Sequence, residues 1–157
     1  MVILGIDPGS IRIGYGVISA DKNLRLIEYG VLEVDKKNSE HQILQIVKQV
    51  SDLIEKYRPS LAGIEKIYFT KNVKTGIAVA QTRGAIISEI TRRNIPMKEF
   101  NPSEIKQAVT NYGQADKKAV AKMVSIILNT EKLTGFDDAS DALAIAITAA
   151  QDKKWGD

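Results

Sequence analysis

The chain of 157 residues is 44% hydrophobic and 26% charged, with a formal net charge of +3, a composition that is ordinary for one soluble globular domain. Because it has no cysteine and one histidine, we exclude disulfides, cysteine-ligated metal centres and histidine-rich metal sites, so any metal must bind to oxygen ligands. The longest apolar run is far shorter than the ~20 residues that span a bilayer, and no basic signal-peptide region opens the chain, so we expect a cytoplasmic protein.

The first part of the chain has the pattern of three strands followed by a helix. Residues 2–7, 11–19 and 24–34 are rich in β-branched and aliphatic residues, and the turn sequences DPGS and ADKN separate them, which predicts an antiparallel meander. A helix is predicted over 40–57, where Arg58-Pro59 ends it. Its apolar residues fall at steps of three and four: Ile43, Val47, Val50, Ile54 and Tyr57.

The rest of the chain alternates strands and helices. Short strands are predicted at 60–67 and 95–100, and helices at 75–93, 102–109, 116–129 and 138–150. The last helix is alanine-rich and apolar nearly all round, so we expect it to be buried. This order predicts an α/β fold, a mixed five-stranded sheet with helices on both faces, in a single domain over 1–157.

The charge of the chain is unevenly distributed. Residues 66–122 hold eleven lysines and arginines against four acids, a net charge of +7, whereas the first 65 residues carry −1 and the last 35 carry −3. A basic middle between acidic flanks would suit a polyanion held by cationic loops over an acidic, metal-binding floor. Lysines that merely solvate helix faces would give the same composition.

Four acids stand out by their placement. Asp7 ends the first predicted strand, Glu65 lies within the apolar run LAGIEKI, and Asp138 and Asp141 open the last predicted helix at positions i and i+3. If the first and fourth strands are neighbours, a helix N-terminus packed across their ends would bring the four carboxylates together. Carboxylates at such short separations repel one another unless a cation binds between them. A cluster that offers only oxygen ligands suits Mg²⁺ or Mn²⁺.

Each acid also has a purely structural interpretation. Asp137 or Asp138 could cap the last helix, Asp141 would suit the helix dipole, and Asp7 before Pro-Gly could start a turn. Glu65 is harder to explain, because a charge in a short buried strand is costly without a partner. The stretch GIDPGS also resembles the first phosphate loop of the actin and sugar-kinase ATPases, but those enzymes close two such domains around the nucleotide, and this chain holds one.

Four longer stretches together resemble the RuvC family of Holliday junction resolvases. They are GIDPGSIRIGYGVI, GIEKIYFTKNVKTGIAVAQTRG, KQAVTNYGQADKKAV and DDASDALAIAI, in the order and spacing of the family and over essentially the whole chain. The resemblance implies a ribonuclease-H-like fold, a homodimer, Mg²⁺-dependent nicking of two opposed strands of a four-way DNA junction, and a branch-migration motor of the RuvA and RuvB type as partner.

The resemblance also implies roles for particular residues. The metal-binding acids of the family match Asp7, Glu65, Asp138 and Asp141, which would hold two Mg²⁺ ions per subunit, with Mn²⁺ as a substitute. We expect Asp7 to bridge the two ions and Glu65 to orient the attacking water. Either Asp137 or Asp138 could match the first acid of the family's last motif. The i, i+3 spacing to Asp141 favours Asp138, which would share its helical face.

Basic and aromatic residues would complete the site. Lys117 matches a family lysine near the scissile phosphate and would neutralise its developing charge, while Lys106 would follow the backbone. In the family an aromatic residue three positions beyond the strand glutamate stacks at the opened junction, which leaves open whether Tyr68 or Phe69 serves here. Further DNA contacts are expected at Lys71 and Lys118.

Paired nicks require two sites, which a two-fold dimer supplies. The 75–93 helix is our candidate contact, through its small residues and its isoleucines, although packing on its own sheet would explain them equally well: Ala78, Gly84, Ala85, Ile77, Ile86, Ile87 and Ile90. Two other functions stay open at this point, a nuclease of the same fold with another substrate and a junction-binding module without catalysis.

Overall fold

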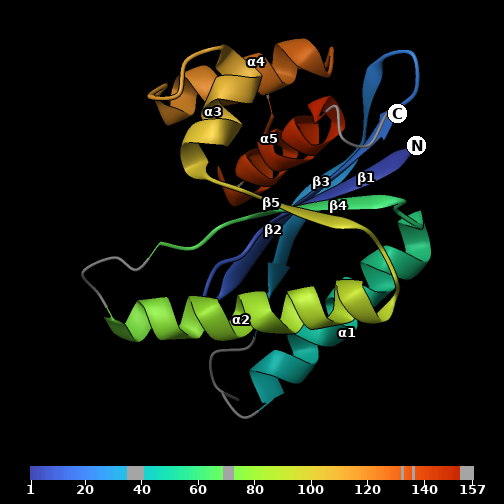
Figure 1. Ribbon diagram of the computed structural model, residues 1–157, viewed down its shortest axis with the longest axis vertical. Coiled ribbons are helices and arrows are strands. Elements are labelled where there is room, and N and C mark those ends of the chain that lie inside the picture. Colours follow the sequence, from blue (N-terminus) through green and yellow to red (C-terminus); the bar gives the residue numbers. More distant parts are fainter. Residues whose placement is uncertain (35–40, 69–72, 132, 136, 153–157) are drawn as a thin grey trace.

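A five-stranded sheet separates the helices into two layers (Figure 1). This computed structural model describes residues 1–34, 41–68, 73–131, 133–135 and 137–152. The strands are β1 (Val2–Asp7), β2 (Arg12–Ala20), β3 (Leu24–Glu33), β4 (Leu61–Glu65) and β5 (Met97–Phe100). The helices are α1 (Gln42–Tyr57), α2 (Val73–Arg92), α3 (Pro102–Thr110), α4 (Lys117–Ile127) and α5 (Asp137–Gln151).

The strand order in the sheet is β3-β2-β1-β4-β5. The first three strands form the predicted antiparallel meander, and β4 and β5 join β1 in parallel, so the sheet is mixed. The first and fourth strands are therefore neighbours, as the sequence allowed. Every element begins and ends within two residues of its predicted bounds.

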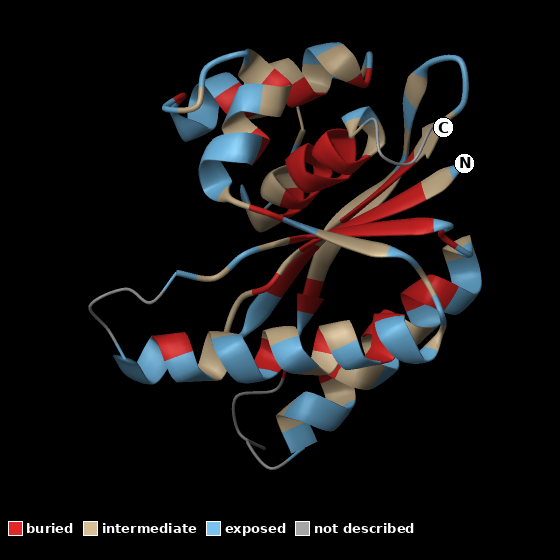
Figure 2. Ribbon diagram, viewed as in Figure 1, coloured by how far each residue is buried: buried red, intermediate tan, exposed pale blue. Residues whose placement is uncertain are grey.

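The alternation of side chains along the strands builds one core on each face of the sheet. Ile3 and Leu61 pack with α3, α4 and α5 on one face, whereas Leu4, Ile6 and Ile64 pack with α1 and α2 on the other. Figure 2 shows α5 as an almost wholly buried helix between the sheet and the α3–α4 pair. The expectation of a buried last helix is confirmed. Among the described helices, none is both long and apolar enough to cross a membrane.

A network of ion pairs links α1 and α2 in addition to their apolar contacts. Glu89 on α2 is 2% exposed and accepts hydrogen bonds from Arg92 and Arg93, and Arg93 also reaches Glu55 on α1 at 2.6 Å. Ile43, the first residue of the apolar pattern read in the sequence of α1, is exposed. The helix turns Ile46, Val50, Leu53 and Ile54 toward the sheet instead.

Candidate active site

Two acids lie at the same edge of the sheet because two parallel strands end there. The pairing Ile6↔Ile64 aligns β1 with β4, so Asp7 and Glu65 are the next residues of adjacent strands. Both share the side-chain parity of Ile3 and Leu61, which face α5. The sheet therefore presents two carboxylates, side by side, to the face that carries α5.

A row of glycines lets α5 approach this face closely. Gly16, Gly5 and Gly63 are paired in register across β2, β1 and β4, and a Cβ at Gly5 would clash with backbone atoms of Ala142 and Ala146. At Gly5 the nearest atoms of α5 belong to two alanines, Ala142 and Ala146, whereas Leu143 lies against Gly16 and Ile145 and Ala149 lie against Gly63.

One more glycine sets the position of the first turn of α5. Gly14 is paired with Asp7, and a Cβ there would clash with the carbonyl group of Asp138. The backbone of Asp138 can therefore lie directly against β2 only because position 14 lacks a side chain. This contact brings the N-terminal turn of α5 to the edge where β1 and β4 end.

The four predicted carboxylates line one pocket of about 350 Å³, together with Lys117, predicted to be catalytic, and Lys106, predicted to bind the DNA backbone. Lys106 comes from α3, whose N-terminus is closed by a capping box between Asn101 and Glu104. Lys117 is the first residue of α4, where the backbone N–H of Ala119 donates to the Asp116 side chain at 2.8 Å. The remaining lining residues are Pro102, Ile105, Val120, Ala144 and Ile145.

Burial and mutual repulsion raise the pKa values of the acids in this pocket. Burial, then the charges of Glu65, Asp141 and Asp138, raises the pKa of Asp7 to about 7, and Lys117 opposes the rise. The pKa values of Glu65 and Asp141 are also raised, in both cases chiefly by burial. The charges of all three other carboxylates act on Asp7.

Two cations are paired with the carboxylates of α5. Lys117 Nζ lies 3.3 Å from Asp141 Oδ2, and this carboxylate raises the pKa of the lysine. Arg12 Nε lies 3.5 Å from Asp138 Oδ2. Arg12 was missed from the sequence. Its signal was a basic residue in an otherwise apolar strand just beyond the DPGS turn, but only the placement of α5 shows that it reaches an acid 126 positions away.

The donor set fits Mg²⁺ chemically. Within the part of the chain that the structure describes, no three histidines or carboxylates form a ready-made metal cage. Mg²⁺ does not need one, because it keeps several waters and is usually bound by one or two carboxylates and by substrate phosphates. The pocket supplies oxygen ligands only, and acids whose repulsion a divalent cation would relieve.

The other predicted DNA contacts are distributed around this pocket. Tyr68 is 59% exposed, and its hydroxyl donates to Asn101 Oδ1 at the start of α3. Phe69 and Lys71 lie outside the described residues. Lys118 is exposed and does not line the carboxylate pocket.

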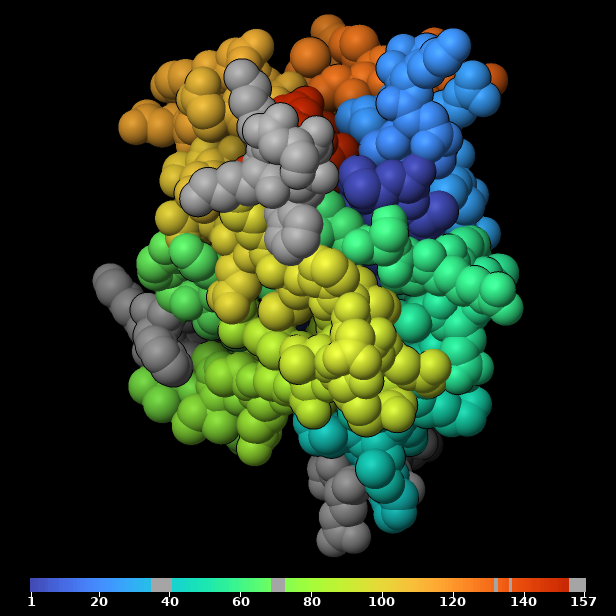
Figure 3. Space-filling model, turned by 45° about the vertical axis from the view of Figure 1, so that its right-hand side comes forward, coloured from blue at the N-terminus to red at the C-terminus, as the bar shows by residue number. Residues whose placement is uncertain are grey.

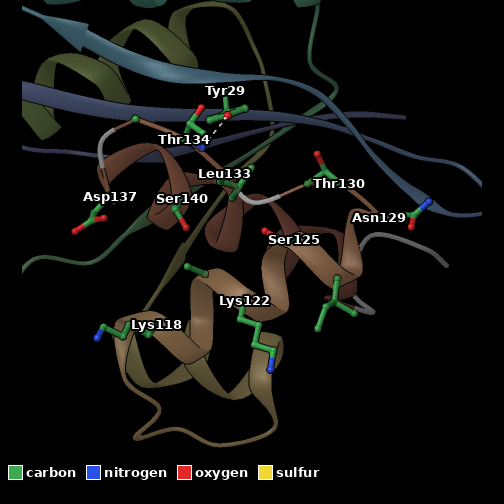
Figure 4. Close-up of a pocket in the computed structure, with 13 residues that line it drawn as sticks. Tyr29, Lys118, Lys122, Ser125, Asn129, Thr130, Leu133, Thr134, Asp137 and Ser140 are labelled. Atoms are coloured by element: carbon green, nitrogen blue, oxygen red, sulfur yellow. Dashed lines mark hydrogen bonds between the residues drawn. The ribbon is translucent and has the colours of Figure 1, made fainter.

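Lys118 lines a different and larger pocket of about 900 Å³ (Figure 4). Lys122 on α4 and Asp137 and Ser140 on α5 also line it, and the amide of Thr134 donates to the hydroxyl of Tyr29 at 3.3 Å. Asp137 thus lines this larger pocket and not the carboxylate pocket. Asp138 and Asp141 line the smaller pocket instead.

The fold and the placement of the acids define a class of protein. The mixed sheet with its central β1–β4 pair, the helices on both faces and the acids at the strand ends are those of the ribonuclease-H-like nucleases. The chain belongs to the RuvC family within that class, because the family model described as crossover junction endodeoxyribonuclease RuvC matches residues 3–149.

Individual relatives agree with this assignment. The crossover junction endodeoxyribonuclease RuvC of Petrotoga mobilis is 47% identical over 148 residues, which cover 93% of this chain and 91% of that protein. The RuvC of Thermosipho melanesiensis is 40% identical, over 99% of this chain and 100% of that protein. The structure of Thermus thermophilus RuvC in complex with Holliday junction substrate superposes with a TM-score of 0.92 at 28% identity, over 99% of this chain and 96% of that chain.

Proposed function

We propose that this protein is an endonuclease that resolves four-way DNA junctions in homologous recombination and repair, by paired symmetric nicks that depend on a divalent metal. Membership of the RuvC family supports this function, and the observation that carries it is the pocket in which Asp7, Glu65, Asp138, Asp141 and two lysines meet. We expect one nuclease domain over residues 1–157, working in the cytoplasm.

The metal ions we propose are two Mg²⁺ per subunit, for which Mn²⁺ would substitute. Asp7 would be shared between them, since its pKa responds to all three other acids. Glu65 would be a ligand on one side, and Asp138 and Asp141 on the other. Such ions, when bound, activate a water and stabilise the leaving oxygen of the phosphodiester.

The cationic and aromatic residues would hold the DNA around this chemistry. Lys117 stands at the N-terminus of α4, where its ammonium group can neutralise charge on the reacting phosphate. Lys106 on α3 would bind the backbone of the same strand, and Lys71 and Lys118 would bind flanking phosphates. The exposed ring of Tyr68 offers a stacking surface for a base at the opened junction, a role that Phe69 could share.

We also propose a homodimer that forms through the outer face of α2. Ile86 and Ile90 are fully buried against the sheet of their own chain, so these two residues do not form the contact, whereas Ile87 is only partly buried against the same core. The opposite face carries exposed apolar and small residues at steps of three and four: Val73, Ile77, Ala80, Gly84 and Ser88. Figure 3 shows α2, in green to yellow, at the surface of the molecule. A second copy would cover it and supply the second active site.

A synthetic mobile four-way junction tests the proposed function. We expect nicks at symmetric positions on two opposed strands with Mg²⁺, none with EDTA, and slower cutting of duplex, flap and RNA–DNA hybrid substrates. Preference for one of those substrates would assign the fold to another nuclease function, and binding of the junction without any nick would assign it to a binding module. A RuvA and RuvB type motor is the partner we expect to load the enzyme.

Matched variants test the site itself. Asp7→Asn and Asp138→Asn should each lower the single-turnover cleavage rate by at least ~100-fold while junction binding persists. Loss of a residue that only orients a metal ligand already lowers activity by up to about 100-fold, and loss of the ligand itself should lower it at least as much. Asp137→Asn makes the same change of charge one residue away and should cleave normally, because Asp137 lines the other pocket. Full activity of Asp7→Asn would contradict the assignment.

A further inference from the structure

A second polar pocket adjoins the carboxylate pocket and shares one acid with it. It has a volume of about 560 Å³ and is lined by the β1–β2 turn from Gly9 to Arg12, by Glu33 and Val34, and by Asp138. Because Asp138 also lines the carboxylate pocket, a chain of phosphates that passes through one pocket would meet the other at this residue.

The backbone around this second pocket is fixed from both sides. A Cβ at Gly9 would clash with the carbonyl oxygen of Arg12, which indicates how tightly the turn closes. The amide of Val34 donates to the carbonyl of Ile11 at 3.2 Å, and Arg12 is paired with Glu33 across the β2–β3 ladder. Arg12 is therefore held at the rim of the active site by its pairing with Glu33 and by the hydrogen bond between the residues next to that pair.

The ion pair between Arg12 and Asp138 is weak enough for Arg12 to exchange this partner for another anion. The two groups lie 3.5 Å apart, with the arginine side chain 47% exposed and the aspartate 31% exposed, and ion pairs that open to solvent are weak. A guanidinium group presents five donors in a planar fork that matches phosphate as well as carboxylate. A DNA phosphate arriving at this rim would compete with Asp138 for the same group.

We propose that the second pocket is a phosphate subsite of the cleaved strand, and that Arg12 moves from Asp138 to the phosphate next to the scissile one. This proposal rests on the proposed function and names a further substrate-binding residue for it. Glu33 opposes a second anion in the pocket, so the subsite takes one phosphate rather than a free polyphosphate. Strand binding thereby leaves the Asp138 carboxylate available for metal binding.

The test compares Arg12→Gln with Arg25→Gln, which removes the same charge from the opposite end of the β2–β3 hairpin. Junction affinity is measured in EDTA, where no nick forms, over a series of salt concentrations. We expect Arg12→Gln to bind the junction about 5–10-fold more weakly, with the slope of log affinity against log salt reduced by about one. Arg25→Gln should change the affinity less than ~2-fold, and Arg12→Lys should recover part of the loss.

A second measurement separates phosphate binding from a merely structural role. Without DNA, Arg12→Gln should bind Mn²⁺ in calorimetry at least as tightly as the wild type, because no guanidinium competes for Asp138. Weaker Mn²⁺ binding with unchanged junction affinity would overturn the proposal and leave Arg12 as a support for Asp138. If the wild type itself neither bound nor cut the junction, the proposed function would fail, whereas wild-type behaviour of Arg12→Gln would overturn only the subsite.

Discussion

Asp7 is the residue at which folding and function conflict most directly. Its folded-state pKa is about 7 against an ordinary value of 3.8, because burial and three neighbouring carboxylates disfavour its charge. Between these values the folded chain holds a proton that the unfolded chain has lost, so the free energy of unfolding falls as pH rises from about 4 to 7. Above pH 7 Asp7 is charged in both states, so its unfavourable contribution to the free energy of unfolding no longer changes with pH.

Asp7→Asn should therefore stabilise the protein in EDTA at pH 8, by an amount on the order of 2–4 kcal/mol, and the gain should vanish toward pH 4. Chemical denaturation at both pH values measures it. Added Mg²⁺ should reverse the order by stabilising only the wild type. Asp52→Asn, on the exposed side of α1, is the control and should change little. If Asp7→Asn were less stable than the wild type at pH 8, the charge of Asp7 among the other carboxylates would not destabilise the folded protein.

The candidate site was predictable where local patterns specify it. Acids that end a strand, interrupt an apolar strand or open a helix are visible in one dimension, and Asp7, Glu65, Asp138 and Asp141 do meet in one pocket. Arg12 was not predictable, because its partner is chosen by packing between elements far apart in the sequence. The buried Ile86 and Ile90 of α2 could not be told from the exposed Ile77 for a related reason: both faces of that helix carry apolar residues, and periodicity does not say which one meets the sheet.

At the scale of elements, the contact between α5 and the sheet determines where the carboxylates lie. Strand and helix bounds follow from turn residues and apolar periods, so they could be predicted closely. The row of Gly16, Gly5 and Gly63 could not be recognised as a packing surface until the strand register placed its members side by side. The alanines of α5 then take on a function, since they let a helix carrying two acids lie against that row.

Gly14→Ala tests this packing directly. The added methyl group would clash with the backbone of Asp138, so the first turn of α5 must move away from β2 and from Asp7. We expect a loss of about 1–3 kcal/mol in the free energy of unfolding and at least ~10-fold weaker Mn²⁺ binding by calorimetry. Gly113→Ala is the matched control, because its Cβ would meet its nearest atom at an ordinary 3.5 Å. Unaltered Mn²⁺ binding by Gly14→Ala would show that the helix position is not critical.

At the scale of the whole molecule, each face of the sheet has a different task. The α3–α4–α5 layer carries the carboxylates and the lysines of the active site, whereas the α1–α2 layer carries none of them. Within the α1–α2 layer, α2 presents an exposed face of apolar and small residues, on which the side chains of Val73 and Ile77 are 66% and 51% exposed. A two-fold axis at that face would leave both active sites uncovered, which is what simultaneous access to two strands of one junction requires.

Gly84→Arg should separate this dimer without disturbing the fold. Apart from the nearby backbone of its own helix, a Cβ at Gly84 meets no atom of the described residues within 4 Å, so the arginine has room in the monomer. It would, however, block the close approach of a second α2. We expect the wild type to sediment as a dimer at micromolar concentration and Gly84→Arg as a monomer with an unchanged circular dichroism spectrum. Gly84→Ala, which keeps the surface small, should remain a dimer. On a junction the arginine variant should nick single strands and lose the paired, symmetric cuts, whereas a Gly84→Arg protein that still sedimented as a dimer would place the contact elsewhere.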